Sequence, residues 1–386
     1  MSDLAVIVGD VTLFLHRGTA ADDLADGLAR LLGQPLADPF AQEVVAVPAR
    51  GVERWLAQRL SHRLGTAPGG SDGVAAGIRF LSPLSLVALV LGLERDDPWR
   101  PEQLAWTVLA AIDDALDEPW ARVLAAHLGE DRALSETERE LRRGRRFAVA
   151  RRLAGLFHAY ALQRPTILTD WRNGGAGDGL GGTVSDDLPH DLPDDLAWQP
   201  ALWRRVLDRV DAPPPDVRHA AVLARLRGAD VGTLDLPGRL SLFGHTRIAR
   251  SEIEVLAALG QRRDVHLWLP QASPAAWDRL APVVAAGPVP RVDDDSALLV
   301  RHPLLASLGR DARELQRTLA LADARDDGRR IGAGSGGALD LLRQRLASHI
   351  VQVGGGFIKE GDVDVADLPY QGEAHSQRRA HLLAAG

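Results

Sequence analysis

The strongest constraint on the fold is an alternation of strand-like and helical segments on both sides of a long helical stretch. Near the start, strands are expected at Val6 to Leu15, Glu43 to Val47 and Ile78 to Leu81. Between them, Asp22 to Leu32 and Gly51 to Leu64 have the periodicity of helices. The alternation returns as a strand at Arg239 to Phe243, a helix around Glu252 to Leu259, a strand at Val265 to Leu269 and a helix from Ser273. This order predicts an α/β fold, with a parallel sheet joined by crossover helices.

The stretch from Trp99 to about Leu226 is helical in character. Pro101 suits a first helical turn, and Ser135 with Glu138 forms a capping-box pattern. A stretch rich in Gly, Asp and Pro, Gly174 to Asp195, predicts an exposed loop. We therefore expect an α/β domain from residues 1–92 and 236–330, a helical insertion at 93–235, and a poorly specified, aberrant or truncated tail at 331–386.

Composition excludes several kinds of site. The chain has no cysteine, so disulfides, thiolate metal sites and cysteine nucleophiles are absent. The single lysine, Lys359, precedes Glu360, so the sequence holds no P-loop lysine for a nucleotide phosphate. No apolar run is long enough for a membrane span, and a cytoplasmic protein is expected. The net charge of -7 argues against a DNA-coating protein, so any DNA contact must be local.

Two arginines follow the expected strand at Glu43 to Val47. Arg50 and Arg54 flank the start of a helix at the carboxyl end of that strand, where open α/β sheets bind ligands and helix N-termini favour phosphate. They are candidate DNA contacts; the alternative is a solvated turn. Trp55 is expected in the core rather than as a stacking platform for bases.

A second basic segment is the expected helix from Glu138 to Gln163. Arginines tracking phosphates beside rings that stack on bases would suit single-stranded DNA. The alternative is a helix with a solvated charged face and a buried apolar face. The arginines and aromatic residues concerned are Arg142, Arg143, Arg145, Arg146, Arg151, Arg152, Phe157, His158 and Tyr160.

Two acidic clusters and one histidine are further candidates for metal or ligand sites. The stretch from Asp186 to Asp195 lacks EF-hand spacing and is expected to be a solvated loop. Asp293 to Asp295 permits a metal-dependent nuclease hypothesis, in which replacing Asp294 would abolish cleavage. His245 follows an expected strand and could touch a ligand; the alternative is a structural or exposed histidine.

Several segments, in order, together resemble the RecC family, the gamma chain of exodeoxyribonuclease V. The resemblance extends over roughly Pro39 to Leu321. The segments are Val44 to Val47 before Gly51 to Leu56, Leu156 to Arg164, Trp198 to Trp203, Leu242 to Gly244 before Val265 to Leu269, and His302 to Leu305. No single segment is specific, and the family's later helicase-like and nuclease-like parts are not recognisable after His349.

The resemblance implies an inactive superfamily 1 helicase-like fold that channels unwound single-stranded DNA and takes part in recognising a regulatory, Chi-type sequence. It implies a noncatalytic subunit of a RecBCD complex in double-strand-break repair and homologous recombination. Its partners would be a RecB-like helicase-nuclease, a RecD-like helicase, and single- and double-stranded DNA. Mg and ATP would act in those partner subunits, and the chain itself would need no cofactor. The expected DNA-binding residues are Arg50, Arg54, Leu156, His158 and Arg164. The alternative is a protein-interaction module or a truncated remnant without a DNA role.

Overall fold

The computed structural model divides the chain into two compact units, which we call the sheet unit and the helical unit. The sheet unit comprises residues up to Val87, Val231–Ile248 and those from Ile253 on, and the helical unit comprises Ala88–Asp230 with Ala249–Glu252. The structure describes residues 13–38, 40–66, 70, 73–91, 97–130, 134–178, 192–228, 236–271, 273–291, 293–322 and 325–331.

Six parallel strands form one sheet in the order β3-β2-β4-β5-β1-β6. Their bounds are β1 Leu13–Gly18, β2 Glu43–Ala46, β3 Ile78–Leu81, β4 Arg239–Phe243, β5 Asp264–Pro270 and β6 Arg325–Ile331. The predicted α/β class is therefore confirmed. The first strand ends later than predicted, at Gly18 rather than Leu15, and residues 1–12 of that prediction lie outside the described part.

The sixth strand was not predicted, because its sequence, Arg-Asp-Asp-Gly-Arg-Arg-Ile, lacks the apolar alternation of a half-buried strand. It pairs with β1 through backbone hydrogen bonds, with a register shift between Leu15 and Arg17. Backbone pairing at an edge strand requires no particular side chains, so the sequence pattern gives no sign of it.

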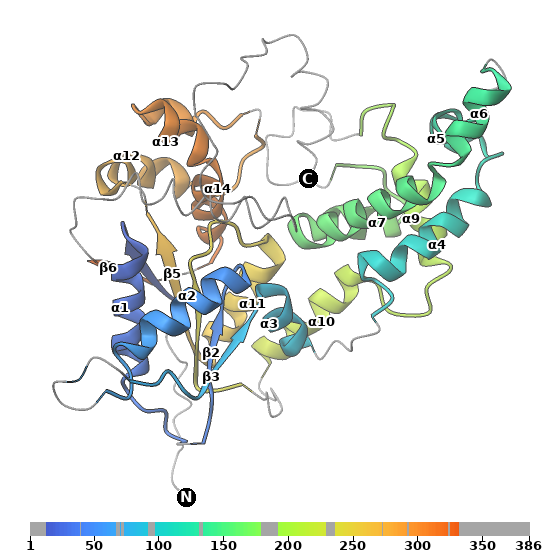
Figure 1. Ribbon diagram of the computed structural model, residues 1–386. Coiled ribbons are helices and arrows are strands. Elements are labelled where there is room, and N and C mark those ends of the chain that lie inside the picture. The colour runs from blue at the N-terminus through green and yellow to red at the C-terminus, as the bar shows by residue number, and fades with distance from the viewer. Residues whose placement is uncertain are drawn as a thin grey trace, which may run out of the picture. The chain divides into compact units, whose positions relative to one another are not determined.

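Helices α1 (Ala21–Leu32) and α2 (Arg50–Ser61) cover one face of the sheet, as Figure 1 shows. Their apolar stripes bury Leu24, Leu28, Leu56 and Leu60 against Val45, Phe243 and Trp268 of the strands. Trp55 is half-buried beside this cluster, with its ring centroid 6.1 Å from that of Phe243, which confirms a packing role.

The other face of the sheet is also buried, as expected for parallel strands. Its apolar side chains include Leu13, Leu15, Val44, Ala46, Leu240, Leu242, Val265 and Leu267. Outside residues 97–228, the remaining α-helices in the described part of the chain are α3 Pro83–Leu91, α11 Arg250–Gly260, α12 Pro274–Val284, α13 Pro303–Leu308 and α14 Arg310–Leu319. Since both faces are covered, ligands can reach this sheet only at the strand ends.

The helical unit contains α4 Pro101–Asp113, α5 Arg122–His127, α6 Glu136–Arg143, α7 Arg146–Gln163, α8 Pro165–Arg172, α9 Gln199–Leu207 and α10 Pro215–Arg227. Its core is aromatic, with Phe157, Trp171 and Trp203 fully buried. Helices α4 and α7 lie side by side (Figure 1). Pro101 occupies the first turn of α4, and the Ser135 hydroxyl accepts a hydrogen bond from the Glu138 N–H at 3.3 Å, as predicted.

The prediction of one helix from Glu138 to Gln163 is wrong. Helix α6 ends at Arg143 and α7 begins at Arg146, with Gly144 as the C-cap of α6. Glycine costs about 1 kcal/mol relative to alanine inside a helix, which favours a break at this position. Most of the predicted loop at Gly174 to Asp195, residues 179–191, lies outside the described residues. No described helix is both long and apolar enough to span a membrane.

Candidate nucleic-acid interface

The carboxyl ends of β2 and β4 are adjacent and form the first candidate surface. From β2 the chain goes outward to β3, whereas from β4 it goes the opposite way to β5. Open α/β sheets commonly bind ligands at carboxyl strand ends whose connections diverge in this way. Gly244, after β4, has φ +76, and a Cβ added there would lie 4.0 Å from Val52 Cγ1. The loop after β4 therefore lies against the first turn of α2.

Arg50 and Arg54 lie on the exposed side of that first turn. Neither side chain makes a hydrogen bond or ion pair with any residue that the structure describes. The N-cap, Ala49, offers no side-chain acceptor, so N–H groups at the start of α2 remain available to a ligand. Glu53 adds one negative charge in the same turn. We call Arg50, Arg54 and this helix start the carboxyl-edge surface.

His245, after β4, is buried rather than exposed, with 3% of its surface accessible. Neither ring nitrogen has a hydrogen-bond partner among the described residues. Burial lowers the pKa of the His245 imidazole to about 4, so the ring is neutral near pH 7. A neutral, enclosed imidazole serves as part of the sheet edge rather than as a charged ligand contact.

An exposed aromatic pair on the helical unit marks the second candidate surface. Trp106 on α4 is 64% exposed and Phe147 on α7 is 42% exposed. Their ring centroids lie 4.8 Å apart, with the ring planes at 40°. Two exposed rings in contact form a small apolar patch, and they offer faces on which bases stack.

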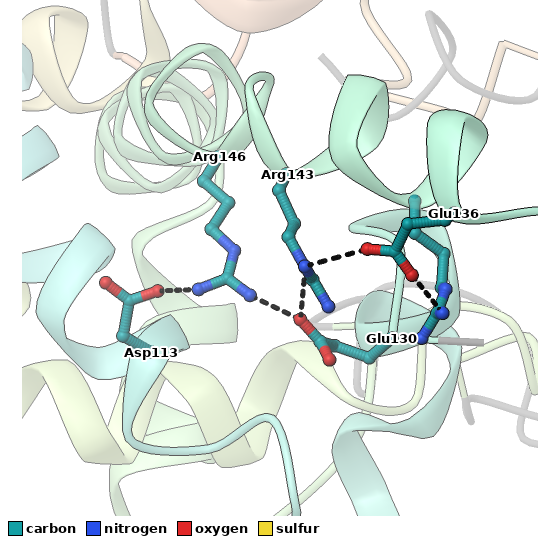
Figure 2. A network of polar contacts seen from close by, with 6 residues as sticks. Asp113, Glu130, Glu136, Arg143 and Arg146 are labelled. Carbon is teal, nitrogen blue, oxygen red and sulfur yellow. Dashed lines mark hydrogen bonds and ion pairs between the residues drawn. The ribbon is translucent and has the colours of Figure 1, made fainter. Parts of the chain in front are cut away.

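The arginines of this segment divide into paired and unpaired groups. Figure 2 shows Arg146 between Asp113, at 3.0 Å, and Glu130, at 2.5 Å. Arg143 lies 3.6 Å from Glu130, and Arg142 pairs with Glu138 at 2.8 Å. These pairs hold α4, α6 and α7 together and neutralise half of the predicted basic stripe.

The other three arginines of the stripe are exposed. Arg145, Arg151 and Arg152 make no side-chain hydrogen bond or ion pair with any described residue. Arg151 follows Phe147 by one helical turn, so the two side chains lie on the same side of α7. We call Trp106, Phe147 and Arg151 the aromatic-basic surface, because Arg145 and Arg152 fall on another side of α7.

His158 lies in one row with Phe147 and Arg151 along α7, eleven residues or about three turns after Phe147. The ring is half-buried, and burial lowers its pKa, opposed by the nearby carboxylates of Glu102 and Asp97 at the start of α4. His158 therefore faces α4, on the same flank as the aromatic pair. The small residue Gly155 lies between them on α7, and a Cβ added there would meet open space.

Leu156 and Arg164, the two remaining predicted contacts, lie apart from this row. Leu156 is half-buried and packs against the aromatic core, on the opposite flank of α7 from His158. Arg164 joins α7 to α8, and its N–H donates to the Tyr160 carbonyl at 2.8 Å. Burial raises the pKa of Tyr160 to about 12, although the Arg164 charge and a Gln199 hydrogen bond oppose that rise. Arg164 is half-buried, so its guanidinium is only partly available to DNA.

The predicted residues thus lie in two groups, Arg50 with Arg54 in the sheet unit and Leu156, His158 and Arg164 in the helical unit. Sequence reasoning missed Trp106 and Phe147. A signal for Trp106 was present, since it falls on the polar stripe of α4 with Glu102, Gln103 and Asp113. A tryptophan in such a stripe is exposed by its position alone.

Within the aspartates at 293–295, Asp294 has a structural role. Burial raises the pKa of Asp294, but hydrogen bonds from Ser296 and the Arg317 guanidinium together lower it below its usual value. Asp294 Oδ1 lies 3.1 Å from Arg317 Nη2. In the described part of the chain, no group of three or more His, Asp or Glu side chains could hold a metal ion. The cluster at Asp186 to Asp191 lies outside the described residues.

Comparison with known proteins gives one consistent family. The family model described as RecC, N-terminal domain, matches residues 13–351. The RecBCD enzyme subunit RecC of Mycobacterium tuberculosis (strain H37Rv) is 54% identical over 318 residues, which cover 82% of this chain and 27% of the relative. The subunit of the same name from Mycolicibacterium smegmatis is 51% identical over 313 residues, covering 81% of this chain and 26% of the relative.

A more distant relative is the RecBCD enzyme subunit RecC of Escherichia coli (strain K12), 24% identical over 242 residues. That alignment covers 60% of this chain and 19% of the relative. The chain spans about a quarter of the length of the mycobacterial relatives it matches.

Proposed function

Because the chain belongs to the RecC family, we propose that it serves as a noncatalytic part of a RecBCD-type complex and binds unwound single-stranded DNA. The complex would act in the repair of double-strand breaks and in homologous recombination. The relatives' names, RecBCD enzyme subunit RecC, support the assembly. Contribution to recognising a Chi-type sequence is part of the same proposal.

The observation that carries the DNA role is the aromatic-basic surface. Trp106 and Phe147 present exposed rings, and Arg151 lies one turn from Phe147 with no acidic partner among the described residues. Stacking on rings and phosphate contact through arginine are the two interactions that hold single-stranded nucleic acid without sequence preference. The carboxyl-edge surface would add phosphate contacts through Arg50 and Arg54.

Catalysis would reside in the partners. The sequence lacks a P-loop lysine, and we propose that ATP and Mg act in a RecB-like helicase-nuclease and a RecD-like helicase. Helicase, nuclease and ATP-binding activities then belong to the complex and not to this chain. The pairing of Asp294 with Arg317 speaks against a nuclease site at residues 293–295.

A protein-interaction module is the second candidate, because exposed aromatic side chains also occur at protein interfaces. The dependence of binding affinity on salt concentration distinguishes this candidate from DNA binding. DNA binding through arginines weakens steeply with salt, whereas docking on the aromatic pair alone does not.

Two measurements test the proposal. Tagged full-length chain is co-purified with its RecB-like and RecD-like subunits, and binding of labelled single-stranded DNA is followed by anisotropy at several salt concentrations. We expect assembly and salt-sensitive binding, weakened by Arg50→Gln with Arg54→Gln and by Arg164→Ala. Arg142→Gln, in a paired arginine, is the matched control. A folded chain that neither assembles nor binds DNA would overturn the proposal.

A further inference from the structure

The side of α4 that carries Trp106 faces α7. Near the end of α4, the Asp113 carboxylate lies 3.0 Å from the Arg146 guanidinium at the start of α7. Near the beginning of α4 is Glu102. Burial lowers the pKa of His158 on α7, and the charge of Glu102 opposes this, so Glu102 lies near that ring. Trp106 lies between these two contacts with α7, on the same stripe of α4.

Glu102 places a carboxylate one helical turn from Trp106. Residues four apart on a helix have Cβ atoms about 5–6 Å apart, so the two side chains are neighbours on α4. Glu102 is exposed, and its carboxylate makes no hydrogen bond or ion pair with any residue that the structure describes. Both of its oxygens are therefore open to a group that stacks on the Trp106 ring.

The hydrogen-bonding capacity of a carboxylate selects among the bases of DNA. An ionised carboxylate only accepts hydrogen bonds, and its oxygens can bind two adjacent donors at once. In single strands, the Watson–Crick edges of the bases are free to be recognised in this way. Guanine alone has two adjacent donors on that edge, the ring N–H and the neighbouring amino group. Adenine and cytosine place a ring nitrogen acceptor beside their amino group, and thymine has a single N–H between two carbonyls.

We propose that Glu102 makes the aromatic-basic surface selective for guanine, by accepting hydrogen bonds from a base stacked on Trp106. Arg151 on α7 would hold a phosphate of the same strand. The selectivity rests on the proposed binding of single-stranded DNA and adds to it the base that is preferred. Stacking and phosphate contacts give affinity for any sequence, whereas the carboxylate discriminates between bases.

Glu102 also lies in the first turn of α4, where a carboxylate stabilises a helix through the helix dipole. That role alone affects the stability of the fold and not the choice of base. The variant Glu102→Gln separates the two roles, because an amide presents one donor and one acceptor to the guanine edge. Glutamine keeps the size of the side chain and loses the match to two donors.

Anisotropy titrations of the tagged full-length chain with labelled oligothymidine, in which one central base is varied, test this selectivity. We expect one guanine to strengthen binding about tenfold over thymine, the order of discrimination by one bidentate pair. Hypoxanthine, which lacks the amino group of guanine, should lose most of this gain. Glu102→Gln should bind the guanine and thymine oligonucleotides alike, with no loss of affinity for thymine. Glu140→Gln, which removes an exposed carboxylate from α6, is the matched control and should keep the preference.

Equal affinity of the wild type for guanine and thymine would overturn the selectivity, and so would a guanine preference that survives in Glu102→Gln. The comparison of guanine with hypoxanthine needs no variant, so it decides if Glu102→Gln does not fold; equal affinity for these two bases would likewise overturn the selectivity. In each of these cases oligothymidine is still bound, and the proposed function stands. A folded wild type that binds none of the oligonucleotides would overturn both the proposed function and the selectivity.

Discussion

The rings of Trp106 and Phe147 lie 4.8 Å apart on neighbouring helices, and both are open to solvent. If bases stack there, Trp106→Ala should weaken binding of single-stranded DNA by about 1–3 kcal/mol, the usual worth of stacking one base on a ring. Anisotropy with labelled oligonucleotides measures this loss. Val123→Ala, which removes an exposed apolar side chain from α5, is the control. Unchanged affinity in Trp106→Ala would contradict the stacking role.

The unpaired arginines predict a change in salt dependence. Replacing Arg145, Arg151 and Arg152 by glutamine should reduce the slope of log affinity against log salt by up to about 2, since each phosphate contact in a single strand contributes about 0.7. Arg143→Gln should change this slope little, because Arg143 already lies beside Glu130 and Glu136. Titrations at four or five salt concentrations give the slopes. Equal slopes in the triple variant and the wild type would show that these arginines do not contact DNA.

The lowered pKa of buried His245 predicts that the folded protein loses stability in acid. Its folded pKa of about 4 lies below the ordinary value of 6.5, so the unfolded chain binds a proton first as the pH falls. The stability contributed by the neutral ring is complete above about pH 6.5 and is lost towards pH 4, on the order of 3 kcal/mol in total. His245→Leu should flatten the dependence of the melting temperature on pH in this window. His127→Asn, at an exposed position, is the control, and a wild-type slope in His245→Leu would refute the prediction.

A buried hydrogen bond in the helical unit predicts a measurable effect on stability. The Tyr160 hydroxyl donates to Gln199 Oε1 at 2.9 Å, within the core. Tyr160→Phe leaves the Gln199 oxygen without this donor and should lower the free energy of unfolding by about 1–3 kcal/mol. Adding Gln199→Leu removes both partners and should recover part of the loss. Urea unfolding of the single and double variants measures both effects, and no recovery would indicate that packing rather than the hydrogen bond is responsible.

Much of the sheet could be predicted because its strands are short apolar runs between helices of regular period. Glu43 to Val47, Ile78 to Leu81, Arg239 to Phe243 and Val265 to Leu269 each match an observed strand within two residues. Strand β6 could not be predicted, since its charged side chains show no alternation. The break at Gly144 was missed because helical periodicity continues on both sides of it.

Less of the candidate site than of the sheet could be predicted from the sequence. An arginine stripe is visible in the sequence, but its ion pairs are not, because Asp113 and Glu130 lie 33 and 16 residues before Arg146. Likewise, the partnership of Trp106 with Phe147 depends on how α4 packs against α7. Tertiary packing decides which arginines form ion pairs, so this division is seen only in the structure.

The order of the strands also limits when the sheet can form during synthesis. Strands β4 and β5 lie between β2 and β1, yet both are translated only after helices α4 to α10. The nascent chain therefore carries β1 and β2 without their central neighbours while well over a hundred further residues are made. Unpaired strand edges of this kind aggregate readily. A ribosome that pauses within residues 97–228 would prolong this exposure, and chaperones that shield nascent strands should matter more for this chain than for a sheet built from consecutive segments.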